Sequence, residues 1–431
     1  MIKLAHAPKK GLHGKISVPG DKSISHRALM FGAIATGVTE IENFLTSDDV
    51  LHTMAIFQAL GVSIEQIGTH VRVVGKGITN FTAPKTALDM GNSGTSTRLL
   101  MGLLSRQPFD MSIIGDSSLS KRPMRRVLTP LEQMGAKINL STEGTLPGVI
   151  QANNQLNGMV YEMPVASAQV KSAILLAGMQ AEGETTIIEK LPSRDHTERM
   201  LQQFGGKIST KNGMITISKQ GVLKGQHVLV PSDISSAAFF IVAGLITPNS
   251  EITIEKVGIN PTRDGVLKLL KRMGAEIAIA KIPTSGEPLA DITVRTQALH
   301  GIHITAADIP SAVDELPIIA LAATQAVGDT IITGAEELRV KETDRIATVV
   351  SELSKLGASI EARPDGMIIH GQTPLATSQD STVLESFGDH RIAMMNAVAA
   401  LITKGDVTLV GEEAMRVSYP KFLSDLAKVM Q

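Results

Sequence analysis

The sequence repeats one unit six times along the chain. A strand-like run, in which polar residues alternate with apolar or β-branched ones, recurs about every 74 residues. The six runs are residues 38–41, 110–113, 184–187, 251–254, 329–332 and 406–409. A chain built from six such copies is expected to form small, similar modules rather than one continuous sheet.

A second landmark has the same period. A glycine follows the second helical segment of each of the first five copies, where a helix C-cap needs a left-handed backbone. These glycines are Gly61, Gly135, Gly205, Gly274 and Gly357. The sixth copy ends where the chain stops, so we expect residues 2–18 to supply its missing strands. One domain would then hold both ends of the chain.

Each unit is predicted as helix, strand, loop, helix, strand and strand, which makes the fold class α/β. Six units in groups of three predict two similar domains, one of residues 1–20 plus 230–431 and the other of residues 21–229. A hydrophobic content of 43% is ample for two cores. Aromatic residues make up only 3%, so aliphatic side chains must fill those cores.

Charge and composition exclude several classes of protein. A net charge of −1 argues against a general nucleic-acid binder. The chain has no cysteine, which excludes disulfides, thiolate metal sites and cysteine nucleophiles. Residues 1–14 lack the apolar core of a signal peptide, and the longest apolar run, 237–246, is too short to span a membrane. We expect a soluble, cytoplasmic protein that works as a monomer.

The residues at the start of each first helix are unusual. Most are N-cap types, and capping alone could explain Ser232, Ser235, Ser236 and Asp389. Capping does not explain the cations, because a positive charge opposes the helix dipole there. These cations are Lys22, Arg27, Arg98 and Arg391. Because helix N-termini bind anions, the pattern predicts a ligand with more than one negative group.

Two of the second loops are also cationic. One carries Lys121, Arg122, Arg125 and Arg126, and the other carries Arg339, Lys341 and Arg345. Clusters at equivalent loops of a repeat favour a binding function over solvated surface charge. The carboxylates Asp314 and Glu342 lie in the same copy as the second cluster. Carboxylates among anion-binding cations would weaken anion binding, so we predict that they transfer protons.

Other motifs are set aside. Residues 20–23 resemble a phosphate-binding loop, but Asp21 stands where that loop needs glycine. No histidine or carboxylate spacing indicates a metal site, so His26 and His390 are interpreted as capping or supporting groups. No dinucleotide-binding glycine fingerprint follows a strand. We therefore expect no metal or organic cofactor.

Over its whole length the chain resembles the 5-enolpyruvylshikimate-3-phosphate synthase (EPSP synthase) family of enolpyruvyl transferases. The resemblance rests on residues 20–27, 91–98 and 339–345, and residues 167–171 resemble the bacterial class II subgroup. It implies two domains, each of three βαβαββ units in an inside-out α/β barrel, with the active site in the interdomain cleft. It also implies sensitivity of the family's site to glyphosate as an inhibitor class.

The resemblance implies roles for individual residues. Shikimate-3-phosphate would contact Lys22, Ser23, Arg27, Ser167, Gln169, Asp314 and Lys341. Phosphoenolpyruvate would contact Lys22, Gly94, Arg122, Gln169, Arg345 and Arg391. Asp314 would accept the proton of the attacking 5-hydroxyl. Glu342 and Lys22 would protonate and deprotonate the methylene carbon.

The implied reaction transfers the enolpyruvyl group to shikimate-3-phosphate and releases phosphate (EC 2.5.1.19), in the shikimate pathway of aromatic amino acid biosynthesis. Two alternatives remain, a UDP-N-acetylglucosamine enolpyruvyl transferase, which usually uses a cysteine, and a non-catalytic repeat protein that binds phosphorylated metabolites. The chain departs from many family members at Val417, Glu337, Ala168 and residues 195–196.

Overall fold

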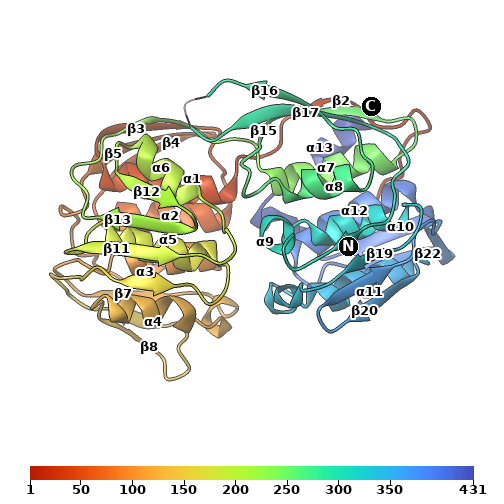
Figure 1. Ribbon diagram of the computed structural model, residues 1–431. Coiled ribbons are helices and arrows are strands. Elements are labelled where there is room, and N and C mark those ends of the chain that lie inside the picture. The colour runs from red at the N-terminus through yellow and green to blue at the C-terminus, as the bar shows by residue number, and fades with distance from the viewer. Residues whose placement is uncertain (285) are drawn as a thin grey trace. The chain divides into compact units, whose positions relative to one another are not determined.

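The predicted repeat forms six small β-sheets within residues 1–284 and 286–431, the part of the chain that the computed structural model describes (Figure 1). Each predicted strand run overlaps a strand of a different sheet. In each sheet the strand before the first helix pairs in parallel with the strand after it. The α/β class and the six-fold repeat are therefore confirmed.

The chain divides into two units by its internal contacts. Unit 1 comprises Met1–Pro19, Pro231–Thr284 and Pro288–Gln431, and unit 2 comprises Gly20–Val230 with residues 286–287. The sheets of unit 2, in strand order, are β14 (His227–Leu229), β3 (Thr36–Glu42), β5 (His70–Lys76) and β4 (Ser63–Ile67); β6 (Leu88–Asp89), β7 (Met111–Ile114), β9 (Gly148–Ile150) and β8 (Ile138–Leu140); and β10 (Val160–Glu162), β11 (Glu184–Ile188), β13 (Met214–Ser218) and β12 (Ile208–Lys211).

The sheets of unit 1 use the N-terminal strands differently from our prediction. In strand order they are β16 (Ala278–Ile282), β17 (Leu289–Arg295), β15 (Glu251–Gly258) and β2 (His13–Ile16); β18 (His303–Ile304), β19 (Thr330–Ile332), β21 (Gly366–Ile369) and β20 (Ile360–Arg363); and β1 (Ile2–Lys3), β23 (Lys404–Val410) and β22 (Ala376–Glu385). Only β1 joins the sixth copy, whereas β2 completes the fourth. The expectation that all of residues 2–18 serve the sixth copy was wrong, because β2 is the parallel partner that β15 requires.

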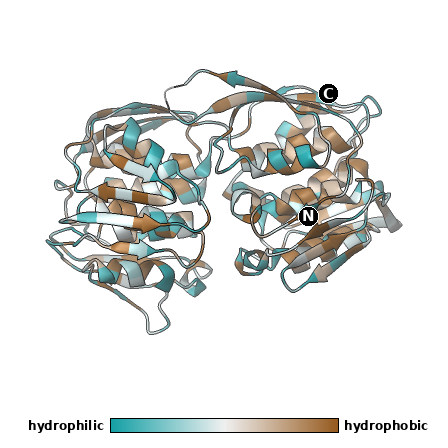
Figure 2. Ribbon diagram, viewed as in Figure 1, coloured by the Kyte–Doolittle hydropathy of each residue, from teal (hydrophilic) through white to brown (hydrophobic). Residues whose placement is uncertain are grey.

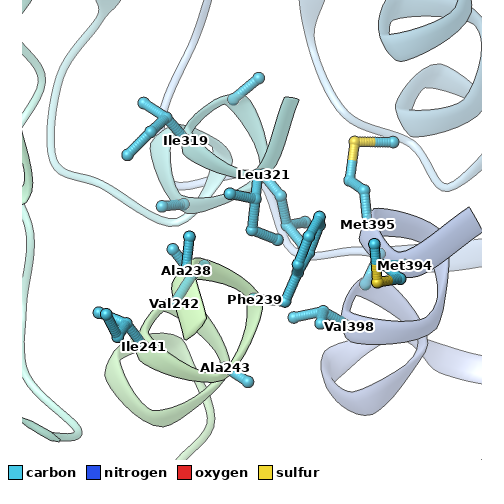
Figure 3. Packing of buried hydrophobic residues seen from close by; sticks show 14 of the residues in the cluster. Ala238, Phe239, Ile241, Val242, Ala243, Ile319, Leu321, Met394, Met395 and Val398 are labelled. Carbon is cyan, nitrogen blue, oxygen red and sulfur yellow. The ribbon is translucent and has the colours of Figure 1, made fainter. Parts of the chain in front are cut away.

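The first helix of each copy lies in a hydrophobic core. These helices are α1 (Lys22–Ile34), α3 (Gly94–Leu103) and α5 (Ala168–Gly178) in unit 2, and α7 (Ile234–Ile246), α10 (Leu316–Thr324) and α12 (His390–Ile402) in unit 1. Figure 3 shows side chains of α7, α10 and α12 meeting, among them Phe239, Leu321 and Met394. Such helices are apolar on nearly all sides because neighbours surround them.

The second helices are amphipathic and end at the predicted glycines. They are α2 (Asp48–Ala59), α4 (Arg125–Gln133), α6 (His196–Gln203), α8 (Gly265–Arg272), α11 (Arg345–Lys355) and α13 (Phe422–Val429). All five predicted glycines have positive φ, for example +83° at Gly61 and +92° at Gly274. In Figure 2 the core helices are brown, whereas α8 also shows hydrophilic residues.

The remaining elements are short. They are α9 (Ile309–Ala312) and the 3-10 turns η1 (Leu119–Lys121), η2 (Glu336–Val340) and η3 (Glu412–Val417). Among the described residues, no helix is both long and apolar enough to cross a membrane. Each of these short elements precedes a helix, so they shape the loops where the predicted site residues lie.

Candidate active site

Five of the first helices in the described chain begin at a side chain that accepts a backbone N–H bond from the first turn. The capping residues are Asp21, Ser93, Ser167, Asp233 and Asp389. The capping interpretation is therefore right for Asp389. For the start of α7 it named the wrong residues, because Asp233 caps this helix. Ser235 is instead hydrogen-bonded to Glu315 and Arg263.

In unit 1, Asp314 lies in the turn between α9 and α10, facing three arginines from three other segments. Its Oδ1 is 3.5 Å from Nη1 of Arg345, and its Oδ2 is 3.7 Å from Nη2 of Arg391. Nη1 of Arg263, just before α8, is 3.9 Å from the same Oδ2. The Asp314 side chain is 16% exposed, so it remains accessible to a ligand. A carboxylate in this position can accept a proton while the cations hold an anion nearby.

Arg345, the first residue of α11, is fixed by two further carboxylates. Its Nε donates to Asp389 Oδ2 at 2.8 Å, and its Nη2 donates to Glu342 Oε2 at 2.6 Å. Arg345 is 1% exposed and Asp389 is fully buried. Burial opposes ionisation of Asp389, but Arg345 outweighs it and lowers the pKa of this carboxyl. The guanidinium is thus held in a set orientation before any ligand binds.

The protonation states next to Arg345 follow from the same charges. Burial alone would raise the pKa of Glu342, but Arg345, His390 and Arg391 outweigh this and lower the pKa well below its usual range. Burial, reinforced by Arg391, lowers the pKa of His390 to about 3. At neutral pH Glu342 is therefore a carboxylate and His390 a neutral imidazole. Glu342 is suited to accept a proton in this arrangement, and His390 carries no charge.

The other cations of the second unit 1 loop have partners of their own. Lys341 donates to Glu337 at 2.8 Å, and its side chain is 22% exposed. Arg339 forms an ion pair with Asp344 at 2.7 Å and donates to two backbone carbonyls. Sequence reasoning grouped Arg339 with the other two cations, but the structure uses it to hold the loop. Lys341 stays near solvent, where a ligand could compete with Glu337.

In unit 2, the start of α3 brings together several predicted ligand contacts. Arg98 Nη1 donates to Gln169 Oε1 at 2.7 Å. Arg122 Nη2 donates to Asn92 Oδ1 at 2.8 Å. A Cβ atom on Gly94 would lie 2.8 Å from Arg98 Nη1 and 3.7 Å from Arg122 Nη1. The glycine therefore leaves open space between two guanidinium groups, at a helix N-terminus, where an anion is favoured.

The two cations of α1 are held by protein groups. Lys22 forms an ion pair with Asp49, and its side chain is 25% exposed. Arg27 is 3% exposed and donates to Thr197, Ser172 and the Ser23 carbonyl. Burial lowers the pKa of Arg27 to about 10, so it remains charged at neutral pH. Lys22 is the more accessible of the two for binding a ligand anion.

His26, on the same helix, has a supporting position. It is fully buried and its Nδ1 lies 2.8 Å from Thr53 Oγ1. Burial, with Lys22 and Arg27, holds its pKa well below the usual value. No group of three or more potential metal-ligating side chains occurs among the residues that the structure describes.

Sequence reasoning missed several charged residues beside these sites. In unit 1 they are Arg263 and Glu315, and in unit 2 they are Asp49 and the buried Lys171, which pairs with Glu189 and Glu198. A charge inside a largely apolar stretch was the available signal for Lys171 and Glu315. For Asp49 and Arg263 the local sequence resembles an ordinary helix start.

Two further positions were singled out in the sequence. Val417 lies at the end of η3 and is only partly buried, with exposed Arg416 before it. A surface hollow of about 550 Å³ lies elsewhere in unit 2, over β12 and β13. None of the predicted site residues lines that hollow, so it has no part in the candidate site.

Comparison with protein families gives one consistent result. Residues 6–426 match the family model described as EPSP synthase (3-phosphoshikimate 1-carboxyvinyltransferase). A 3-phosphoshikimate 1-carboxyvinyltransferase from Leuconostoc mesenteroides is 73% identical, over 100% of this chain and 99% of that protein. The protein of that name from Bacillus cytotoxicus is 51% identical, over 98% and 99% of the two chains.

Solved structures agree. An EPSP synthase from Acinetobacter baumannii superposes with a TM-score of 0.89 at 46% identity, covering 99% of this chain and 97% of that one. The enolpyruvyl transferase NikO from Streptomyces tendae has a TM-score of 0.79 at 20% identity, covering 99% and 96%. The second likeness shows a shared fold only.

Proposed function

Because this chain belongs to the EPSP synthase (3-phosphoshikimate 1-carboxyvinyltransferase) family, we propose that it transfers the enolpyruvyl group of phosphoenolpyruvate to the 5-hydroxyl of shikimate-3-phosphate. Inorganic phosphate is the second product. The observation that carries the assignment of residues is the turn before α10, where Asp314 faces three arginines at 3.5–3.9 Å. A proton acceptor surrounded by fixed cations is what an addition to an anionic substrate requires.

Addition begins with proton transfer to phosphoenolpyruvate. An acid protonates its terminal carbon, and the second carbon becomes electrophilic. The 5-hydroxyl oxygen then bonds to that carbon while its proton passes to Asp314. We assign the acid role to Lys22, because Glu342 is already a carboxylate in this structure. The product of this half-reaction is a tetrahedral intermediate.

Elimination completes the reaction. A base removes a proton from the new methyl group, the carbon–oxygen bond to phosphate breaks, and the double bond re-forms. Glu342 suits this step, because its carboxylate is held ionised by Arg345 at 2.6 Å and its side chain is 34% exposed. Addition and elimination thus use different groups, and each group starts in the protonation state that its step needs.

The anionic groups of the substrates are assigned to the remaining residues. We propose that Arg345, Arg391, Arg122 and the space at Gly94 bind phosphoenolpyruvate, with Lys22 and Gln169. Shikimate-3-phosphate is assigned to Ser23, Arg27, Ser167, Gln169, Lys341, Asp314 and Lys22. Arg27 and Ser167 already bond to protein groups, so their contribution includes holding α1 and α5 in place.

The protein's setting is also a proposal. We propose a cytoplasmic enzyme that acts on these small molecules as a monomer, without binding nucleic acid. Size-exclusion chromatography with light scattering tests the first point, since a monomer has a mass of 45.7 kDa. A mass of twice that value at enzyme concentrations used in assays would contradict it.

The activity is tested by mixing the purified protein with both substrates and following phosphate release. Release that needs both substrates supports the proposal. Release with UDP-N-acetylglucosamine in place of shikimate-3-phosphate would instead support the alternative transferase. Binding of both substrates without turnover would support a non-catalytic protein.

The base assignment has its own test. Asp314→Ala is expected to bind shikimate-3-phosphate with similar affinity and to lose about 10²–10⁴-fold in kcat, the range of general base catalysis. Binding is measured by calorimetry and turnover by phosphate release. Near-normal turnover of this variant would show that another group accepts the proton.

A further inference from the structure

Glu315, the residue after the proposed base, is a buried carboxylate without an obvious structural need. It is 1% exposed, and its Oε1 accepts a hydrogen bond from Ser235 Oγ. Its Oε2 is buried and receives no hydrogen bond from the described residues. An unsatisfied buried carboxylate oxygen is costly, so its presence calls for an explanation.

The nearest cation to Glu315 is Arg263, which is shared with Asp314. Arg263 Nη1 is 3.4 Å from Glu315 Oε1 and 3.9 Å from Asp314 Oδ2. The Nη2 of Arg263 donates to Ser235 Oγ at 2.6 Å and lies 3.3 Å from Asp233 Oδ1. The guanidinium therefore stands between the two adjacent carboxylates, closer to Glu315.

The backbone keeps this arrangement from relaxing. Gly265, the first residue of α8, packs so closely on α9 that an added Cβ would collide with the backbone of Ser311. The segment carrying Arg263 and the turn carrying Asp314 are thus locked together in unit 1. Small shifts of Arg263 between the two carboxylates are left to side-chain rotation.

We infer that Glu315 and Arg263 are positioning residues for Asp314, in which Glu315 draws the Arg263 guanidinium away from the proposed base. If Arg263 moved to hydrogen-bond distance, it would stabilise the Asp314 carboxylate and make it a poorer proton acceptor. Asp314 also faces Arg345 and Arg391, but Asp389 and Glu342 already hold Arg345. The inference rests on the proposed function, since it concerns the base of that reaction.

The decisive variant is Glu315→Gln, which keeps the size of the side chain and removes its charge. Arg263 should then move towards Asp314. We expect kcat to fall about tenfold or more, while KM for both substrates changes less than about threefold. The acid limb of the kcat–pH profile should move to lower pH, because a closer cation favours the ionised base.

The double variant Arg263→Gln, Glu315→Gln separates positioning from general damage. Without the guanidinium there is nothing to capture Asp314, so kcat should recover to within about threefold of the wild type. A structural role would instead make the double variant as slow as the single one, or slower. Recovery supports the inference, and its absence overturns it.

Glu352→Gln is the matched control. Glu352 is also a fully buried carboxylate of unit 1, but it pairs with Lys355 and accepts the backbone N–H of Glu385. This variant should lose stability without moving the pH profile. If Glu315→Gln does not fold, Arg263→Lys replaces it as the test. Lysine cannot bridge Ser235, Asp233 and Glu315 as a guanidinium does, so kcat should fall about tenfold with KM unchanged.

The outcomes distinguish the two proposals. No phosphate release by the wild type would refute the proposed function itself. Wild-type turnover with an unchanged kcat and pH profile in Glu315→Gln would refute only the positioning role.

Discussion

Replacing Asp389 with asparagine should cost unit 1 about 3 kcal/mol of stability at pH 7. Asp389 is fully buried and bonds to Arg345 Nε at 2.8 Å. Removing one partner of a buried ion pair costs about 3–5 kcal/mol, because the other charge is left uncompensated. The lower end applies here, since Glu342 still pairs with Arg345 at 2.6 Å.

The helix cap must be counted separately. Asp389 Oδ1 accepts the N–H of Arg391 at 2.8 Å, and asparagine caps helices as well as aspartate does. Asp389→Asn therefore measures the lost charge alone. Asp389→Ala should cost about 1 kcal/mol more, because it also removes the cap.

Urea unfolding followed by circular dichroism measures these differences. Asp308→Asn is the control, because it removes one partner of an exposed pair with Arg272 and should cost less than about 1 kcal/mol. A cost for Asp389→Asn no larger than that of the control would refute the idea that Arg345 depends on Asp389.

The same variant makes a prediction about pH. The folded-state pKa of Asp389 lies below its unfolded value, so its contribution is complete above about pH 4 and is lost as pH falls below that. The difference between wild type and Asp389→Asn should therefore be constant from pH 8 to pH 5 and narrow only in stronger acid. Narrowing between pH 7 and pH 5 would mean that Arg345 does not lower this pKa.

Three other variants test separate parts of the structure. Tyr419→Phe should cost about 1 kcal/mol in urea unfolding and leave kcat unchanged, because the buried hydroxyl donates to Asp425 at 3.0 Å. Glu337→Gln should lower KM for shikimate-3-phosphate up to about fivefold, since it frees Lys341 from an exposed pair; an unchanged KM would argue against Lys341 as a ligand contact. Gly102→Ala should destabilise unit 2 by about 1–3 kcal/mol or more, because a Cβ there would collide with the backbone of α5.

The repeat could be predicted from sequence because its signals are local. A glycine such as Gly61 or Gly274 marks a helix end by its own backbone requirement, and the strand runs mark themselves by alternation. The exchange of short strands could not be predicted. β2 and β14 have only a few residues each, and either could pair with several sheets by pattern alone. Their partners depend on the tertiary fold.

The site could be predicted in part for the same reason. Lysines and arginines at helix starts stand out in the sequence, but a charge does not reveal its partner. Arg339 and Arg27 turn out to hold protein groups, whereas Asp314 meets Arg345 and Arg391. Such pairs join residues far apart in the chain, and no spacing rule relates them.

The charge balance around Asp314 says how this set of residues can work. Within the described residues of unit 1, three arginines contact five carboxylates, those of Asp233, Asp314, Glu315, Glu342 and Asp389. The arginines are therefore oriented before a substrate arrives, which spares reorganisation during the reaction. The same carboxylates repel an anionic ligand and reduce the affinity that the arginines could provide. An arrangement that gives up ground-state affinity for fixed geometry favours the transition state over the substrate, which is the condition for a larger kcat.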